Sequence, residues 1–288
     1  MSNFTSTNIQ IDTDNPRGGL NLSFDMGSPS LQVSPTWHTA GWNLTFVRLS
    51  GVLELGQGEY YVKVITGGLE NPELTALGRP FEVRSTRVNQ TVLHPAKQGC
   101  LAAVFEKTVD CPENLHAVGE MTWSGPHNEA LAWQSFEDKF AGIIDAFDGL
   151  DCYMATGFHL IDENGVEIAY LNPWCCGKGV DLTTHNHSRP PSDMSPAFAE
   201  VHWVFNNGTG SGGMYETAEP GATDRVRHTL GSGDEHGPYF DLDENGKPVR
   251  LANGAVKYPW HGWQGGLDDD PKQAYDYVAA FEINPDYI

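Results

Sequence analysis

The hydrophobic residues of this chain come in short runs that end at glycine, proline, asparagine or aspartate. Runs of this length and composition are typical of β-strands joined by turns. They predict strands over residues 43–49, 60–65, 80–86, 101–109 and 129–136. Apolar residues recur at helical spacing over 135–149, which predicts a helix that ends at Gly149.

The second half of the chain repeats this pattern around two identical turn sequences. Asp-Glu-Asn-Gly lies in the middle of 158–171 and again within 239–254. Asparagine followed by glycine tolerates the positive φ of a tight turn, so 158–171 is predicted to be a β-hairpin and 239–254 to repeat its turn. Alternating residues over 200–205 and an apolar run over 275–283 predict two further strands.

The composition also indicates an all-β chain with few short helices. The 288 residues include 32 glycines and 18 prolines, and there are few of the long Ala-, Leu-, Glu- and Lys-rich stretches that build a helical bundle. Residues 1–20 have little core-forming content and are expected to form a polar arm. The remaining strands divide near residue 150, which predicts two sandwich or barrel domains over 21–150 and 151–288.

The charge of the chain excludes one class of partner. The sequence has 17 lysines and arginines against 38 aspartates and glutamates, a formal net charge of −21. Such a surface repels nucleic acid and anionic membranes, and it suits a neutral or cationic small ligand. The sequence has no apolar run of membrane-spanning length, and its N-terminus does not resemble a signal peptide. We therefore expect a soluble protein of the cytoplasm.

The cysteines and one acidic run offer two further candidate metal sites. The five cysteines are an odd number without the spacing of a disulfide framework. Cys175 and Cys176 fit a thiolate metal site or a buried apolar pair, and the pair is favoured because no second pair completes a ligand set. The run Asp268–Asp270 fits a calcium site or a solvated turn, and the turn is favoured because it lacks the alternating acids and central glycine of a calcium loop.

Two pairs of polar residues stand out in the second half of the chain. His185 and His187 are two positions apart, and so are Glu200 and His202. Residues i and i+2 of a strand point to the same face, so each pair projects to one side. Burying several imidazole and carboxylate groups without a cation costs roughly several kcal/mol of desolvation. This cost favours a metal site.

The spacing around the first pair resembles the metal site of the cupin family of small β-barrels. Gly179 precedes His185 by the interval seen in the first cupin motif, which supplies His-x-His and a glutamate. The second motif contains a proline and supplies the last histidine, which in the stretch GAVKYPWHGW is His261. The chain departs from the family pattern because Glu200 lies thirteen residues after His187, across a proline-rich stretch that we interpret as an inserted loop.

The resemblance implies a metal site made of His185, His187, Glu200 and His261. Three imidazoles and one carboxylate suit a divalent transition metal better than calcium or magnesium, which prefer oxygen ligands. We expect Zn²⁺, with Fe²⁺, Mn²⁺ and Ni²⁺ as alternatives. Because the first half has no His-x-His, the resemblance implies one ion per chain and an N-terminal cupin that lacks metal ligands.

The stretch from Thr184 to Tyr215 and the length of the chain further resemble the bicupin region of the aldos-2-ulose dehydratase/isomerase family and ascopyrone tautomerase. This resemblance implies a metal-dependent isomerase or tautomerase, possibly with dehydratase activity, that acts on an ascopyrone- or anhydrofructose-type keto-sugar. Two other functions fit the same residues: an Fe(II) cupin dioxygenase and a non-catalytic sugar-binding bicupin. The sequence leaves a monomer and a homodimer open.

Roles inside the expected site remain to be divided among several residues. Glu200 and His202 are the candidate catalytic groups, with His202 either a supplementary ligand or a proton carrier. Trp203 and Trp260 fit sugar stacking or packing, and packing is favoured for Trp203. His236 is left undecided between a pocket rim and a simple turn. The remaining candidates are expected to be hydrogen-bonded structural residues: His94, His116, His127 and His159.

Overall fold

The computed structural model describes residues 9–13, 19–28, 31–39, 42–70, 86–88, 91–108, 122–123, 152–154, 157–176, 184–188, 190–191, 196–207, 212–220, 222–231, 234–236, 240–266 and 276–287. Within these ranges the chain forms strands β1 to β18 and one short 3-10 helix, Pro285–Tyr287. The all-β prediction is therefore confirmed. The helix predicted over 135–149 and the strand predicted over 129–136 lie outside the described residues, and so does most of the strand predicted over 80–86.

A nine-stranded sheet forms the middle of the molecule and joins the two ends of the chain. Strand β2, from the start of the chain, runs parallel to β11, whereas the other pairs in this sheet are antiparallel. Its strands in spatial order are β1 (Gln10–Asp12), β2 (Leu20–Phe24), β11 (Phe158–Asp162), β12 (Glu167–Cys176), β18 (Asp276–Ile283), β13 (Ala199–Asn207) and β16 (Glu235–His236), with β10 (Cys152–Met154) and β9 (Thr122–Trp123) attached to β12.

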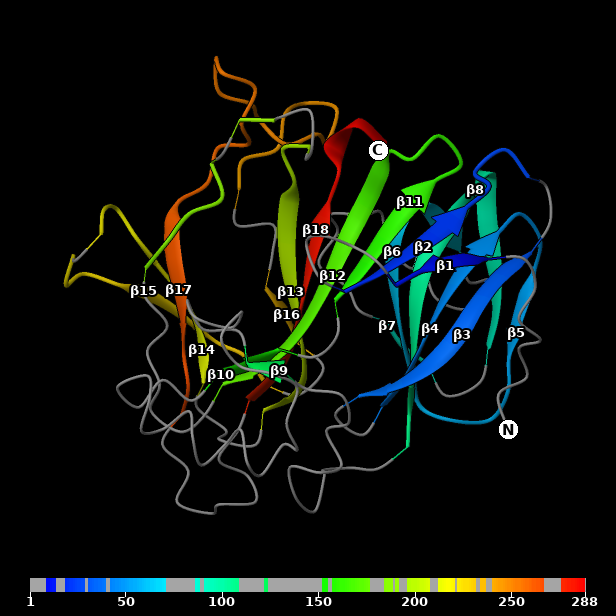
Figure 1. The fold of residues 1–288 in the computed structure, drawn as a ribbon. Helices are drawn as coiled ribbons and strands as arrows, with labels where there is room; N and C mark the ends of the chain where they lie inside the picture. The colour runs from blue at the N-terminus through cyan, green and yellow to red at the C-terminus, as the bar shows by residue number, and fades with distance from the viewer. Residues whose placement is uncertain are drawn as a thin grey trace.

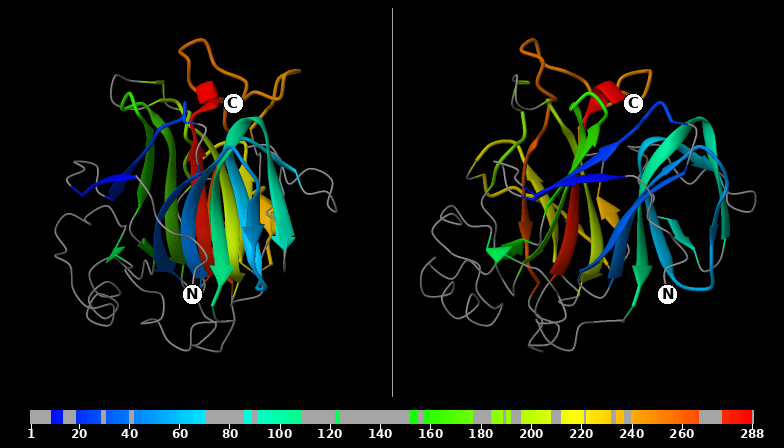
Figure 2. Two further views of the ribbon diagram at one scale, coloured as in Figure 1. Left: turned by 90° about the vertical axis from the view of Figure 1, so that its right-hand side faces the viewer. Right: turned by 45° about the vertical axis from the view of Figure 1, so that its right-hand side comes forward.

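Two smaller sheets accompany the nine-stranded sheet. The first comes from the N-terminal half and contains, in order, β3 (Gln32–Thr39), β4 (Trp42–Leu49), β8 (Thr91–Lys107), β6 (Tyr60–Glu70) and β7 (Thr86–Val88), with β5 (Leu53–Leu55) paired to β8. The second contains β15 (Val226–Thr229), β14 (Gly213–Thr217) and β17 (Trp260–Gln264). Figure 1 shows the nine-stranded sheet between these two, and most of the long strands stand roughly upright in the views of Figure 2.

Strand alternation assigns the two faces of β13 to different neighbours. Trp203 is 1% exposed and packs against Trp42, Tyr61 and Phe105 of the N-terminal sheet, with ring centroids 4.5 to 5.6 Å apart. Its neighbour His202 projects to the opposite face. The packing role favoured for Trp203 is confirmed, and the side of β13 that carries His202 is turned toward the three-stranded sheet.

The repeated Asp-Glu-Asn-Gly turn adopts the same local structure twice. Gly165 and Gly246 have φ values of 82° and 75°, a region that glycine enters without steric cost. The aspartate at the start of each turn accepts two backbone N–H bonds through one carboxylate oxygen. The hairpin predicted over 158–171 is confirmed as β11 and β12, whereas the described residues 240–254 form the turn with isolated bridges and no strand.

The order of strands bears on how the two halves of the chain are joined. Because β2 pairs with β11, a segment from the start of the chain completes the sheet formed by its second half. The domain limits at residues 20 and 150 stay a prediction. No helix in the described part of the chain combines the length and the apolar character that crossing a membrane requires.

Candidate metal centre

Backbone pairing brings His185 and His261 side by side. The N–H of each residue donates to the carbonyl oxygen of the other, and both hydrogen bonds are 2.9 Å long. In such an antiparallel pair the two side chains lie on the same face, and the ring centroids here are 4.6 Å apart. The distant motif around His261 is thereby placed next to the His-x-His segment.

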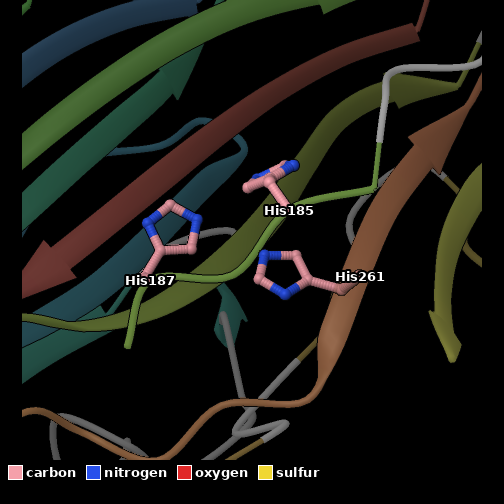
Figure 3. Close-up of side chains that lie close together, drawn as sticks. All are labelled: His185, His187 and His261. Atoms are coloured by element: carbon pink, nitrogen blue, oxygen red, sulfur yellow. The ribbon is translucent and has the colours of Figure 1, made fainter. Parts of the chain in front are cut away.

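His187 completes a cluster of three imidazoles. Its ring lies 5.1 Å from those of both His185 and His261, and it is nearly parallel to the His261 ring. The three residues each offer a nitrogen atom within 4.8 Å of the other two. Figure 3 shows the rings converging from β17 and from the extended segment that carries His185 and His187.

The environment of His261 sets its tautomer and charge. His261 is fully buried, and its Nδ1–H donates to the carbonyl oxygen of Pro259 at 3.1 Å. The lone pair is then on Nε2, because a neutral imidazole carries its hydrogen on one nitrogen. Burial, with a further contribution from His185 and His187, lowers the pKa of His261 to about 3, so the ring is neutral at physiological pH.

Glu200 lies beside this cluster on β13. It is 4% exposed, with Oε2 at 2.7 Å from His187 Nε2 and Oε1 at 3.1 Å from His202 Nε2. Burial by itself raises the pKa of the Glu200 carboxyl, but the rings of His187 and His202 outweigh it and hold the pKa well below its usual value. Glu200 is therefore a buried carboxylate that connects the imidazole cluster to His202.

A second carboxylate, missed by the sequence analysis, faces Glu200 from the neighbouring strand. Glu282 on β18 is the cross-strand partner of Glu200, and both offer an oxygen within 4.8 Å of His187. Like charges directly opposite each other in a sheet repel, and a bound cation relieves that repulsion. Strand alternation alone could have placed Glu282 on this face, but its pairing with Glu200 is a long-range contact.

Tyr258 is a second residue of the site, after Glu282, that the sequence did not predict. Its buried hydroxyl donates to the carbonyl oxygen of Phe198 at 3.1 Å and accepts the backbone N–H of Glu200. Burial, followed by the Glu200 carboxylate, raises the pKa of Tyr258 well above its usual value, so the phenol stays protonated. The ring lies 5.5 Å from that of His187 and fixes the start of β13 against the cluster.

His202 shares the face of Glu200, as expected from their spacing. It is 4% exposed and makes an edge contact with Trp174. Among the described residues it belongs to none of the three groups whose ligand atoms converge within 4.8 Å. His236, left undecided from the sequence, lies opposite His202 in the β13–β16 pair and converges with Glu216 and His228 instead.

The other residues singled out in the sequence lie away from this cluster or outside the description. His159 is buried and bonded to Glu167 on the β11–β12 hairpin, which confirms a structural role. Trp260 is partly buried on β17. Outside the described side chains lie Cys175, Cys176, His94, His116, His127 and Asp268–Asp270.

Comparison with known families identifies the chain. Residues 41–284 match the family model of the aldos-2-ulose dehydratase/isomerase (AUDH) cupin domain. The chain belongs to this family. It therefore has a cupin fold, and cupins usually bind a divalent metal, for which the His and Glu clusters supply ligand types.

One curated relative is an aldos-2-ulose dehydratase from Phanerodontia chrysosporium. It is 31% identical to this chain over 148 residues, which cover 48% of this chain and 16% of that protein. The chain thus aligns with a small part of a much longer relative. Both this relative and the matching family model are named for an aldos-2-ulose dehydratase.

Solved cupin structures are similar over most of the chain at low identity. The oxalate decarboxylase of Lactobacillus farciminis, solved as a formate complex, is 12% identical, with 99% of this chain and 86% of that chain covered and a TM-score of 0.28. A cupin 2 conserved barrel domain protein from Leptotrichia buccalis is 10% identical, with 88% and 89% covered and a TM-score of 0.25. Scores this low add nothing to the family assignment.

Proposed function

We propose that the chain is a metal-dependent isomerase or tautomerase of a keto-sugar derivative, of the ascopyrone or anhydrofructose type. The observation that carries the proposal is the convergence of three imidazole nitrogens beside a buried carboxylate, in a chain of the AUDH cupin family. The net charge of −21 favours a neutral sugar over an anionic phosphosugar.

The donor set fits a divalent transition metal. His185, His187 and His261 would hold the ion with Glu200, and the ring of His261 already has the neutral state and tautomer that a ligand needs. The Pro259 carbonyl fixes that ring in the way that outer hydrogen bonds orient metal-bound histidines. Zinc is the metal we expect. When bound, it would supply a positive charge that stabilises the oxyanion developing on the carbonyl oxygen as the neighbouring carbon loses its proton.

The proton transfer of the proposed reaction is assigned to side chains of the protein. Because a carboxylate only accepts hydrogen bonds, the contact of His202 Nε2 with Glu200 Oε1 requires the hydrogen on Nε2. Nδ1 of His202 is left as the basic nitrogen, and we assign it the proton transfer between neighbouring carbons of the substrate. Glu200 orients the ring, and the hydroxyl of Tyr258 holds the backbone of Glu200.

The assay of this proposal follows absorbance and oxygen together. Zinc-loaded protein is incubated with an ascopyrone- or glucosone-type keto-sugar, and we expect the ultraviolet absorbance to shift without oxygen consumption. Removal of the metal with a chelator should abolish the change, and added zinc should restore it. Oxygen uptake in proportion to product would contradict the isomerase and favour a dioxygenase, while binding of the sugar without turnover would favour a non-catalytic cupin.

A further inference from the structure

A second group of metal-ligating side chain types lies next to the His185–His187–His261 cluster, where two sheets meet and where Glu216 is the cross-strand partner of His261. Glu216 on β14 and His228 on β15 come from the three-stranded sheet, and His236 on β16 comes from the edge of the nine-stranded sheet. All three offer a ligand atom within 4.8 Å of the others. The group therefore connects two sheets at their edge strands, β15 and β16.

The distances in this group differ from those of hydrogen bonds. Glu216 Oε1 lies 3.4 Å from His236 Nε2 and 3.6 Å from His228 Nε2. Charge-assisted N–H···O contacts are shorter, as at Glu200, where the two contacts with His187 and His202 are 2.7 and 3.1 Å. Two ligand atoms that share a tetrahedral ion with bonds of about 2.0 to 2.1 Å lie about 3.3 Å apart. The spacing around Glu216 is close to that separation.

The donor atoms are also turned inward. The His228 ring is 38% exposed, yet its Nε2 atom is buried and makes no hydrogen bond within the described residues. Two imidazoles and one carboxylate are a ligand set used for zinc and for other divalent transition metals.

The position of His236 is held from the other face of its strand. Glu235, the preceding residue, pairs with Lys63 of the N-terminal sheet, and both side chains are buried. Because consecutive strand residues point to opposite faces, this ion pair directs His236 toward Glu216 and His228. On its own strand pair, His236 lies opposite His202, which contacts Glu200 of the first cluster.

From this geometry we propose that Glu216, His228 and His236 form a second binding site for a divalent transition metal such as zinc. The ion would bridge the two sheets, and three protein ligands would leave one position of a tetrahedral ion free. This second site has three protein ligands and is partly exposed. It therefore binds its ion more weakly than the first cluster, which has a fourth ligand. The inference does not depend on the isomerase proposal, since it concerns zinc binding alone.

The test is a calorimetric titration of the metal-stripped full chain with Zn²⁺ alone. Wild-type protein should show a tight site and a weaker one, and zinc at the concentration of the weaker site should raise Tm. His228→Ala should weaken the second site at least about tenfold and reduce the zinc-dependent rise in Tm, since even partners that only orient a ligand cost that much. His187→Ala should weaken the tight site and preserve the second.

Thr229→Ala is the matched control, because Thr229 is exposed and adjacent to His228 on the same edge strand. It should titrate like the wild type. Glu216→Gln tests the carboxylate separately and should reproduce the effect of His228→Ala. If wild-type protein binds a single zinc ion, or if both variants retain the second site with unchanged affinity, the proposal is wrong. A cooperative unfolding transition in each variant establishes that the fold has been retained.

Discussion

Lys63 on β6 and Glu235 on β16 form an ion pair between residues 172 positions apart in the sequence, with side-chain exposures of 3% and 2%. The pair joins the N-terminal sheet to the edge of the sheet that carries Glu200 and His202. Removal of one partner from a buried pair leaves an uncompensated charge in the interior.

Lys63→Met should therefore destabilise the protein by about 3–5 kcal/mol in denaturant unfolding. Lys257→Met removes an exposed pair with Asp241 and should cost less than about 1 kcal/mol. Replacing both members of the buried pair, as Lys63→Met with Glu235→Leu, should recover much of the loss. Equal destabilisation by the two single lysine variants would show that the buried pair contributes no more to the free energy of unfolding than the exposed pair.

The roles of Glu200 and His202 can be separated by two substitutions. His202→Gln should retain the metal and the fold but lower turnover about a hundredfold or more, the scale of losing an acid/base group. Glu200→Gln should weaken metal binding, because an amide oxygen is a poorer ligand than a carboxylate. Metal content and turnover are measured on the same preparations. Release of metal by His202→Gln and its retention by Glu200→Gln would reverse the two assignments.

Asp162 makes the stability of the β11–β12 hairpin dependent on pH. Burial alone raises the pKa of Asp162, but the hydrogen bond from Tyr287 and those from the amides of Val166 and Asn164 outweigh it and lower the pKa. A carboxyl with a lowered pKa in the folded state stabilises the fold above its unfolded pKa, near 3.9, and loses that contribution as the pH falls through the folded value.

We therefore expect wild-type protein to be more stable than Asp162→Asn at pH 6, and the difference to shrink below pH 4. Denaturant midpoints of both proteins at a series of pH values measure this difference. Asp243→Asn at the other Asp-Glu-Asn-Gly turn is the comparison, because Asp243 is exposed and contacts no tyrosine among the described residues. A difference at Asp162 that stays constant from pH 6 to pH 3 would contradict the explanation.

Local sequence patterns predicted several of the strands and much of the histidine and glutamate cluster. The i, i+2 spacing that placed His185 with His187, and Glu200 with His202, depends only on neighbouring residues, and the structure keeps both pairs on common faces. The Asp-Glu-Asn-Gly turns were predictable for the same reason, since the positive φ is a property of the turn itself.

Contacts between distant strands account for what the sequence did not reveal. Glu282 meets Glu200 only because β18 pairs with β13, and His236 meets Glu216 only where two sheets approach each other. Strand β16 has two residues, too few for an alternating pattern to be recognised. The parallel pairing of β2 with β11 could not be predicted either. Leu20 pairs with Phe158, 138 residues away, and no local pattern specifies so distant a partner.

The metal content of the purified chain tests the central claim most directly. After gel filtration in metal-free buffer, elemental analysis should find about one tightly bound divalent transition ion per chain, with the weaker second site filling only on addition of zinc. His187→Ala should lose the ion, and Asn186→Ala, between the two histidines, should retain it. A folded wild-type chain that carries no ion and takes up none, or a His187→Ala variant that retains a full equivalent, would contradict the account.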